Sequence, residues 1–573
     1  MIKACGRIHC KFNSSVLLAI AFATPLISAH AASVENWRRD IDEIVLSVRG
    51  IHPDPFARIG RLEFLRNADA LKADLPRLSE EQRVTRAMRL VALLGDTHTQ
   101  LEPKRPDFAL WYPFRIYEFS DGYFVTAAHR SVAELAGAQL LEVAGLPVQR
   151  VVDSARELMG ADNASAKKER LFAFSNAALM NGLGYAQADG RLRIKFRLNS
   201  GTITERTLLP SKSDDPRYAK DDSTFDWYQQ AEMGGPPFGG VDAWISAYKG
   251  LAYSAFRTTD PTRPLQLMNR RNIAAKSLPD QSAFYIQANY MGDDLPQKFR
   301  LALQEVDQLR PRRLIVDFRY NFGGDGSHVP AIVREFIKRE TSNGWKELYI
   351  LTGPRTFSAG IMAVVALATN TSHTVIGEPI SAPVNSYGDA RTIQFPRTGL
   401  QLTLSTVLNQ LGAATDIHPF APVDIPAPMS FADYASGRDP AVDAILRGDE
   451  MRSLSVIALS DGGLVARQAW IQRGDSFAKF AWWSPPQEID LRRAAQKLIE
   501  QKRVVDAIEV AKLNAEIHPG IWNVWYNLAK AQIEGGQKRE ALENFCQVLK
   551  IDPNNGNADE IRGAFAEAGI ALN

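Results

Sequence analysis

Residues 348–360 read Leu-Tyr-Ile-Leu-Thr-Gly-Pro-Arg-Thr-Phe-Ser-Ala-Gly. This stretch indicates a strand–turn–helix unit, because an apolar run of strand length passes through a tight turn into a helix that begins after Ser358. A serine at such a junction has its hydroxyl beside the free N–H groups of the helix N-terminus, which can stabilise an oxyanion. Serine is also a preferred N-cap residue, so this stretch alone leaves both a catalytic and a capping role open.

Strands and helices alternate around this stretch. The sequence predicts strands over Phe284–Tyr290, Arg313–Phe318 and Leu348–Thr352, and helices over Pro296–Gln308, Val329–Arg339 and Ala359–Ala368. Alternation at these lengths predicts an α/β core with a largely parallel sheet.

A second glycine-rich turn, Gly323-Gly324-Asp325-Gly326, follows the strand before. It has neither the Lys-Ser/Thr ending of a phosphate-binding loop nor a Gly-x-Gly-x-x-Gly pattern at a strand end. The other interpretation is that Gly323 lets bare backbone approach a substrate carbonyl and donate a hydrogen bond to an oxyanion. We interpret the nearby Asp317, Arg319 and Asn321 as structural, since charged groups flanking a buried strand usually pair with each other or with backbone.

The regions before this core have a different pattern. Residues 34–99 show helical periodicity with a capping box at Ser79 and Gln82, and end in the loop Gly95–Thr99. From Phe108 onward, short β-like runs broken by glycines predict a small sheet with one or two helices, in an order that resembles a PDZ-like module. Residues 200–280 lack regular periodicity and predict a long surface excursion.

The C-terminal region carries a repeat. Pro519 and Pro553 are 34 residues apart, as are Ala507 and Ala541. This period, with tryptophan and tyrosine near the start of the second unit, is the signature of tetratricopeptide helix–turn–helix repeats. Because about three repeats are needed to bury a continuous core, two units are expected to lean on the preceding domain.

The N-terminus has the pattern of a secretory signal peptide. Lys3, Arg7 and Lys11 precede the apolar segment 15–28, and Ala29-His30-Ala31 forms a small-x-small cleavage site. The apolar run is shorter than the ~20 residues that a spanning helix needs. Cleavage after residue 31 leaves 64 basic and 65 acidic residues, which excludes a large basic nucleic-acid footprint. Cys546 is then the only cysteine, so the mature chain can form no internal disulfide.

Several motifs in combination resemble one enzyme family. They are Asp317-Phe318-Arg319-Tyr320-Asn321-x-Gly323-Gly324, Thr356-Phe357-Ser358-Ala359, Gly377-Glu378-Pro379 and the upstream Gly95-Asp96-x-His98-Thr99. Together with shorter matches over Val34–Arg447 they resemble the tail-specific, or C-terminal-processing, serine peptidases, including their tricorn-core-like relatives. The resemblance implies a core of ClpP/crotonase-like type and Ser358 as the nucleophile.

The family exists in two catalytic forms, a Ser-Lys dyad and a Ser-His-acid arrangement. No lysine lies between Lys346 and Lys479, which excludes a dyad with a lysine downstream of the nucleophile. The resemblance places the general base at His98, and His328, close after the glycine turn, is the alternative.

The resemblance also implies the remaining groups. Asp416 matches the position of the acid in tricorn-like members, and Glu378 is the alternative acid. The backbone N–H groups of Gly323, Gly324 and Ala359 would form the oxyanion hole. The chain departs from the family pattern after Glu378-Pro379, where residues 380–382 read Ile-Ser-Ala instead of Thr-Gly-Gly and make the loop stiffer.

The sequence therefore predicts a multi-domain chain of α/β class, α+β overall. The expected parts are a signal peptide (1–31), an N-terminal helical domain (32–105), a PDZ-like β-rich module (106–200), an irregular insertion (201–280), an α/β serine peptidase core (281–450), a connector (451–486) and tetratricopeptide-repeat helices (487–573). We expect a periplasmic or secreted peptidase whose substrates are peptides or proteins, and a protein partner at the repeats. No cofactor, metal, nucleic acid or membrane span is expected. The alternative is a catalytically inactive scaffold that binds peptides or partners with the same parts.

Overall fold

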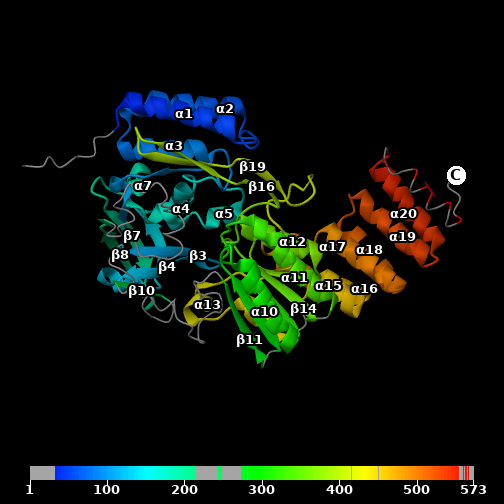
Figure 1. The fold of residues 1–573 in the computed structure, drawn as a ribbon. Helices are drawn as coiled ribbons and strands as arrows, with labels where there is room; N and C mark the ends of the chain where they lie inside the picture. The colour runs from blue at the N-terminus through cyan, green and yellow to red at the C-terminus, as the bar shows by residue number, and fades with distance from the viewer. Residues whose placement is uncertain are drawn as a thin grey trace, which may run out of the picture.

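The computed structural model describes residues 32–212, 243–247, 273–279, 282–342, 344–414, 416–448 and 451–553, with isolated positions after 553. The predicted signal peptide (1–31) and most of the predicted insertion (201–280), namely residues 213–242 and 248–272, lie outside the described residues. Among the described helices, none is long and apolar enough to cross a membrane. Figure 1 shows the N-terminal helices and sheets at one end, the α/β core in the middle and the C-terminal helices at the other end.

The α/β core is built on a six-stranded sheet. Its strand order is β11 (Ile273–Leu278), β12 (Ala283–Ala288), β13 (Arg313–Asp317), β14 (Glu347–Thr352), β15 (Thr374–Gly377) and β20 (Ile425–Pro426). Every neighbouring pair is parallel except β11 and β12. Strands β12 to β15 are buried along their whole length, as expected for parallel strands covered on both faces. The predicted α/β class is confirmed.

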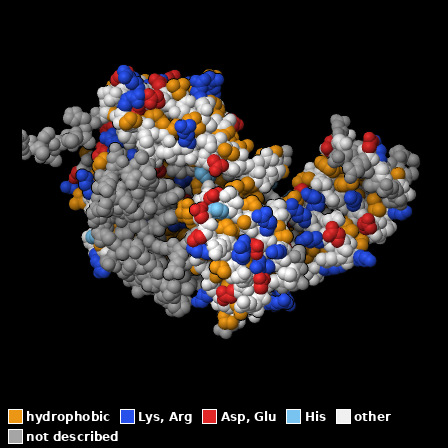
Figure 2. Space-filling view, in the orientation of Figure 1, with side chains coloured by type: hydrophobic (Ala, Val, Ile, Leu, Met, Phe, Trp, Pro, Cys, Tyr) orange, Lys and Arg blue, Asp and Glu red, His pale blue; other side chains and the backbone are white. Residues whose placement is uncertain are grey.

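Helices cover both faces of this sheet. One face carries α10 (Leu295–Leu309), α11 (Val329–Thr341) and α12 (Ala359–Asn370), whose apolar side chains pack on Phe284, Val316 and Ile350. The other face carries α14 (Pro440–Arg447), which packs on Tyr285 and Ile315. Basic and acidic side chains are interspersed over the outward surface of the α10–α11 layer (Figure 2). The helices are therefore amphipathic, as their sequence periodicity predicts.

The β-rich module is larger than predicted. It is a seven-stranded sheet of β3 (Phe114–Phe119), β4 (Gly122–His129), β5 (Gln139–Val143), β6 (Leu146–Pro147), β7 (Leu192–Arg197), β8 (Ile203–Leu208) and β10 (Trp244–Ser246). The short helices α4 (Val148–Arg156), α5 (Ala164–Lys168), α6 (Phe172–Ser175) and α7 (Ala177–Gly182) accompany it. The PDZ-like assignment of this module stays a prediction.

The N-terminal helices α1 (Val34–Ile51), α2 (Arg61–Asp74) and α3 (Glu80–Ala92) pack beside a small antiparallel sheet. The capping box at Ser79 and Gln82 is present at the start of α3, as predicted. The sheet joins β1 (Gln100–Pro103) to β18 (Leu400–Leu404) and β17 (Arg391–Phe395), with Leu101 opposite Leu402. Residues 391–404, predicted as part of the core, thus pair with the N-terminal region.

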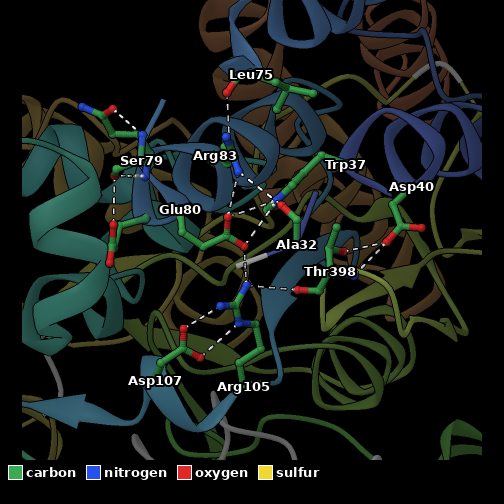
Figure 3. A network of polar contacts seen from close by, with 12 residues as sticks. Ala32, Trp37, Asp40, Leu75, Ser79, Glu80, Arg83, Arg105, Asp107 and Thr398 are labelled. Atoms are coloured by element: carbon green, nitrogen blue, oxygen red, sulfur yellow. Dashed lines mark hydrogen bonds and ion pairs between the residues drawn. The ribbon is translucent and has the colours of Figure 1, made fainter. Parts of the chain in front are cut away.

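A polar network fixes the turn between β17 and β18 to these helices (Figure 3). The Asp40 carboxylate accepts hydrogen bonds from the backbone N–H (3.1 Å) and hydroxyl (2.8 Å) of Thr398. Glu80 accepts hydrogen bonds from Trp37, Arg83 and Arg105, and Arg105 also reaches the Thr398 carbonyl. Burial raises the pKa of Asp40, and the Thr398 donors oppose that rise.

The C-terminal helices form one continuous array. They are α15 (Leu454–Asp461), α16 (Gly463–Ala478), α17 (Glu488–Glu500), α18 (Val504–Ile517), α19 (Trp522–Glu534) and α20 (Lys538–Ile551). The segment predicted as a connector contains α15 and α16, which share one apolar cluster with α17, α18 and α19. Arg493 and Lys497 of α17 donate to the Thr369 carbonyl and the Ser372 hydroxyl of the core. The array therefore leans on the core, while its tetratricopeptide identity stays a prediction.

Candidate active site

Ser358 lies between β14 and α12 in a conformation that only a few per cent of non-glycine residues adopt. Its φ is +52° and its ψ is −127°. It occupies the N-cap position of α12, yet its side chain makes no capping hydrogen bond. A sparsely populated backbone conformation of this kind costs about 1–3 kcal/mol and persists only where the surroundings impose it. Of the two roles that the sequence leaves open for Ser358, the structure does not show capping, because the side chain makes no capping hydrogen bond.

The glycine turn lies directly against this serine. Gly323 has a φ of +110°, and a Cβ placed on it would lie 2.6 Å from the Ser358 Cβ and 3.1 Å from the Ala359 nitrogen. The Phe357 N–H donates to the Asn321 carbonyl (2.8 Å), and the Asn321 amide donates to the Ala288 carbonyl (3.1 Å). Only glycine allows this approach, because any Cβ would collide with the serine.

The predicted oxyanion donors differ in their present partners. The Gly323 N–H donates to the Asn321 Oδ1 at 3.0 Å. Within the described residues, no hydrogen bond is donated by the N–H groups of Gly324 and Ala359. Ala359 therefore offers a ready donor beside Ser358, whereas Gly323 would have to exchange Asn321 for a substrate oxygen.

His98 lies beside the residue that precedes the serine. Its ring stacks on Phe357 with centroids 4.1 Å apart, and a Cβ on Gly388 of β16 (Asn385–Gly388) would lie 3.6 Å from its Cε1. Its two ring nitrogens are buried and find no hydrogen-bond partner among the described residues, Ser358 included. The Tyr387 backbone favours the protonated ring without reaching hydrogen-bond geometry.

The ring of His98 is held as a neutral base. Burial is the largest influence on its pKa and lowers it from the usual 6.5, and the Asp96 charge is the largest influence that opposes this. A neutral imidazole carries a proton on one ring nitrogen. Its other nitrogen, which has no hydrogen-bond partner here, can accept a proton, as a general base requires.

Both predicted acids have other partners. The Asp416 carboxylate accepts from the Nδ1 (2.7 Å) and backbone N–H (3.0 Å) of His418, and Gln487 at the start of α17 lies 3.5 Å away. Glu378 forms an ion pair with Lys168 at 2.5 Å. Neither carboxylate forms a hydrogen bond with His98. The structure thus brings Ser358, the glycine turn and the loop of His98 together but not the acids.

Sequence reasoning assigned no role to Asp96, which the structure places in the same loop as His98. Its side chain is only 2% exposed and contacts His52, Thr99 and Ser405. The motif Gly95-Asp96-x-His98-Thr99 was the available signal, since it places a carboxylate two residues before the candidate base.

The rival base, His328, lies in a different environment. Its Nε2 is 3.4 Å from the Asp293 carboxylate and 3.7 Å from that of Asp325, on the surface. One ligand atom from each of these three side chains lies within 4.8 Å of the others, so they could hold a divalent cation. No hydrogen bond joins His328 to Ser358 in the described part of the chain.

Asp317 and Arg319 have structural partners, as predicted. Asp317 is fully buried and accepts hydrogen bonds from Tyr285 and Arg319, while Arg319 also binds Asp439 at 2.8–2.9 Å. The two carboxylates take up the donors of the buried guanidinium, so these groups are paired with one another without a ligand. This network anchors the glycine turn to the core.

Comparison with known proteins gives the fold. No protein-family model and no curated protein matches the chain. Among solved structures, a point mutant of CPAF is 14% identical, covering 72% of this chain and 97% of its own, with a TM-score of 0.51. Mature CPAF (15% identity, 72% and 97% covered, TM-score 0.49) and the photosystem II D1 C-terminal processing protease (13%, 72% and 96%, 0.33) also match. The chain shares the fold of the CPAF mutant.

Proposed function

We propose that the chain is a serine-type peptidase with Ser358 as its nucleophile. The observation that carries the proposal is the conformation of Ser358, which is backbone-strained, placed at a helix N-terminus and not used as a cap. The predicted PDZ-like region supports peptides or proteins as substrates, since such a module could bind a peptide by strand addition. The signal-peptide pattern supports a periplasmic or secreted location.

The steps follow from the groups at the site. His98 takes the Ser358 proton as the hydroxyl oxygen attacks the peptide carbonyl carbon. The Ala359 N–H, joined by Gly323 or Gly324, binds the oxyanion. His98 then gives the proton to the leaving nitrogen, the C–N bond breaks, and water releases the acyl group by the same route.

A specific observation favours the alternative, a non-catalytic scaffold, because both candidate acids are paired away from His98. The discriminating experiment is labelling with a serine-reactive phosphonate, followed by mass spectrometry of the modified peptide. We expect modification at Ser358 in the wild type and none there in Ser358→Ala. Modification to the same extent in both chains, at another residue, rules out this nucleophile.

The acid is a separate part of the proposal. Asp416, once released from His418, would orient His98 by accepting from its second nitrogen. Asp416→Asn is then expected to lower kcat by up to roughly 10⁴-fold with an unchanged melting temperature, because the imidazole is left in the unproductive tautomer.

Glu378→Gln is the matched control for this change. It breaks the ion pair with Lys168 and is expected to have the smaller effect on kcat. A crippling effect of Glu378→Gln together with a mild effect of Asp416→Asn would reverse the assignment.

The C-terminal array has two candidate roles. A notch separates the far end of the array from the core (Figure 2), and helical-repeat surfaces bind partner segments, which supports the recruitment of a protein partner. Its shared apolar cluster with α15 and α16 supports a buttress role for the helices nearest the core. We therefore propose a recruiting surface on α19 and α20, which lie farthest from the core (Figure 1).

A further inference from the structure

The loop of the candidate base contains a buried carboxylate surrounded by hydrogen-bond donors. The Asp96 Oδ2 accepts from Thr99 Oγ1 and from Ser405 Oγ (2.6 Å), and it lies 3.2 Å from His52 Nε2. Its Oδ1 accepts from the backbone N–H of His98 at 3.0 Å. These donors come from the residue that caps the C-terminus of α1, from the loop itself and from the residue just after β18. The position of the carboxylate is therefore fixed from three directions.

Every one of these donors is neutral. His52 Nδ1 accepts the backbone N–H of Asp54 (3.2 Å), so the ring proton lies on Nε2 and points at Asp96. Among the described residues, no lysine or arginine forms an ion pair with Asp96, and the nearby Arg58 pairs with Asp162 (3.0 Å). The negative charge of Asp96 is consequently solvated by the protein but not neutralised.

A buried carboxylate without a cation is expensive to keep. The donors hold it in its ionised form, with a pKa lowered to about 2. Two rings can become its cation: His52, which already donates to it, and His98, two residues along, whose charge interacts favourably with it. Two other charged side chains act on His98: Arg170 disfavours the protonated ring, and Asp389, after β16, favours it.

We propose that Asp96 is a positioning residue whose fixed negative charge stabilises His98 at the moment it carries the Ser358 proton. The carboxylate acts without touching the ring, through its hydrogen bond to the His98 backbone and through its field. This inference rests on the proposed function, since it needs His98 as the base.

The test is Asp96→Asn, which keeps the shape and removes the charge. Two linked effects on kcat/KM are expected, because the charge of Asp96 favours protonated His98 both in the free enzyme and in the transition state. In the profile of kcat/KM against pH, the midpoint of the acid limb moves down by about one pH unit. The plateau value of kcat/KM falls by roughly tenfold for each unit of that shift. A residue that only supports the loop would lower the plateau and leave the midpoint where it was, and this outcome overturns the proposal.

Asp162→Asn is the matched control. Asp162 is another buried carboxylate that binds the same loop, through the Thr97 N–H at 2.9 Å, but it is not among the largest influences on the pKa of His98. Its variant is expected to keep the wild-type midpoint. A shift equal to that of Asp96→Asn would show that the effect is not specific to Asp96 and would overturn the proposal.

A second measurement separates this inference from the proposed function. In the Ser358→Ala chain, the histidine ring protons are titrated by NMR, with and without Asp96→Asn. A lower His98 midpoint without the carboxylate supports the proposal whether or not the phosphonate labels Ser358, and an unchanged midpoint overturns it even when labelling succeeds. If Asp96→Asn does not fold, the double variant Thr99→Val with Ser405→Ala takes its place. It removes two donors to Asp96, which favours protonation of that carboxylate and is expected to lower the titration midpoint of His98. An unchanged midpoint in the double variant overturns the proposal as well.

Discussion

His98→Ala is expected to lower kcat of peptide hydrolysis by roughly 10⁴- to 10⁶-fold, because a serine without its base is almost as weak a nucleophile as no serine at all. The chain should stay folded, since the ring contributes a stacking contact with Phe357 and no ring hydrogen bond within the described residues. The measurement uses a fluorogenic peptide chosen by digesting a peptide library, with circular dichroism as the folding check. His328→Ala is the control and should retain turnover close to that of the wild type, and the reverse pattern would transfer the role of base to His328.

The pH dependence of the wild type follows from the same residue. Because burial lowers the pKa of His98, its neutral form persists below pH 6.5. Activity is therefore expected to be constant near neutrality and to fall only as the pH drops through that lowered pKa. An acid limb centred above pH 6.5 would contradict this reading of the site.

Gly323→Ala is expected to lower kcat by roughly 10²- to 10³-fold, the loss typical of removing one oxyanion donor. The added Cβ would lie 2.6 Å from the Ser358 Cβ, and the φ of +110° is one that alanine rarely adopts. The loop of Ser358 and the loop of Gly323 would have to move apart, which displaces both the nucleophile and the oxyanion donor. Kinetics at saturating substrate should show the loss mainly in kcat.

Gly353→Ala is the matched control for this substitution. Gly353 lies in the turn before the serine, and a Cβ there would make only an ordinary contact at 3.5 Å with Arg319. This variant should retain most of its turnover. Equal losses in both variants would show that the turn is merely sensitive to bulk, and the special role of Gly323 would be withdrawn.

The sequence predicted the core closely because each element there carries its own local signal. Apolar runs such as Leu348–Thr352 mark strands, and Pro296 marks the start of a helix. The structure places both within a few residues of those positions, with Pro296 as the second residue of α10. The pairing of β1 with β18 was missed, since no local pattern tells a strand which partner it will find some hundreds of residues later. The polar shell of Asp96 was missed for the same reason, because Ser405 and His52 lie far from it in the sequence.

The candidate site was predictable at Ser358 and Gly323, where glycine spacing and the strand-to-helix junction restrict the backbone. The orientation of the acids was not, because a carboxylate such as Asp416 has several neighbours to choose from and its choice depends on side-chain packing. Residues 451–486 were assigned to a connector on the strength of Pro485 and Pro486, and α15 and α16 precede those prolines. A proline pair marks one end of a helical segment without describing what comes before it.

The pairing of β1 with β18 has a consequence for how the chain folds. Synthesis supplies Gln100–Pro103 long before Leu400–Leu404, so this contact closes one of the largest loops in the chain and forms late. His98 stands just before β1, and its loop is completed by Ser405 just after β18. A nascent chain therefore lacks an organised loop around the proposed base, and under the proposed function hydrolytic competence arises only when the polypeptide is nearly whole.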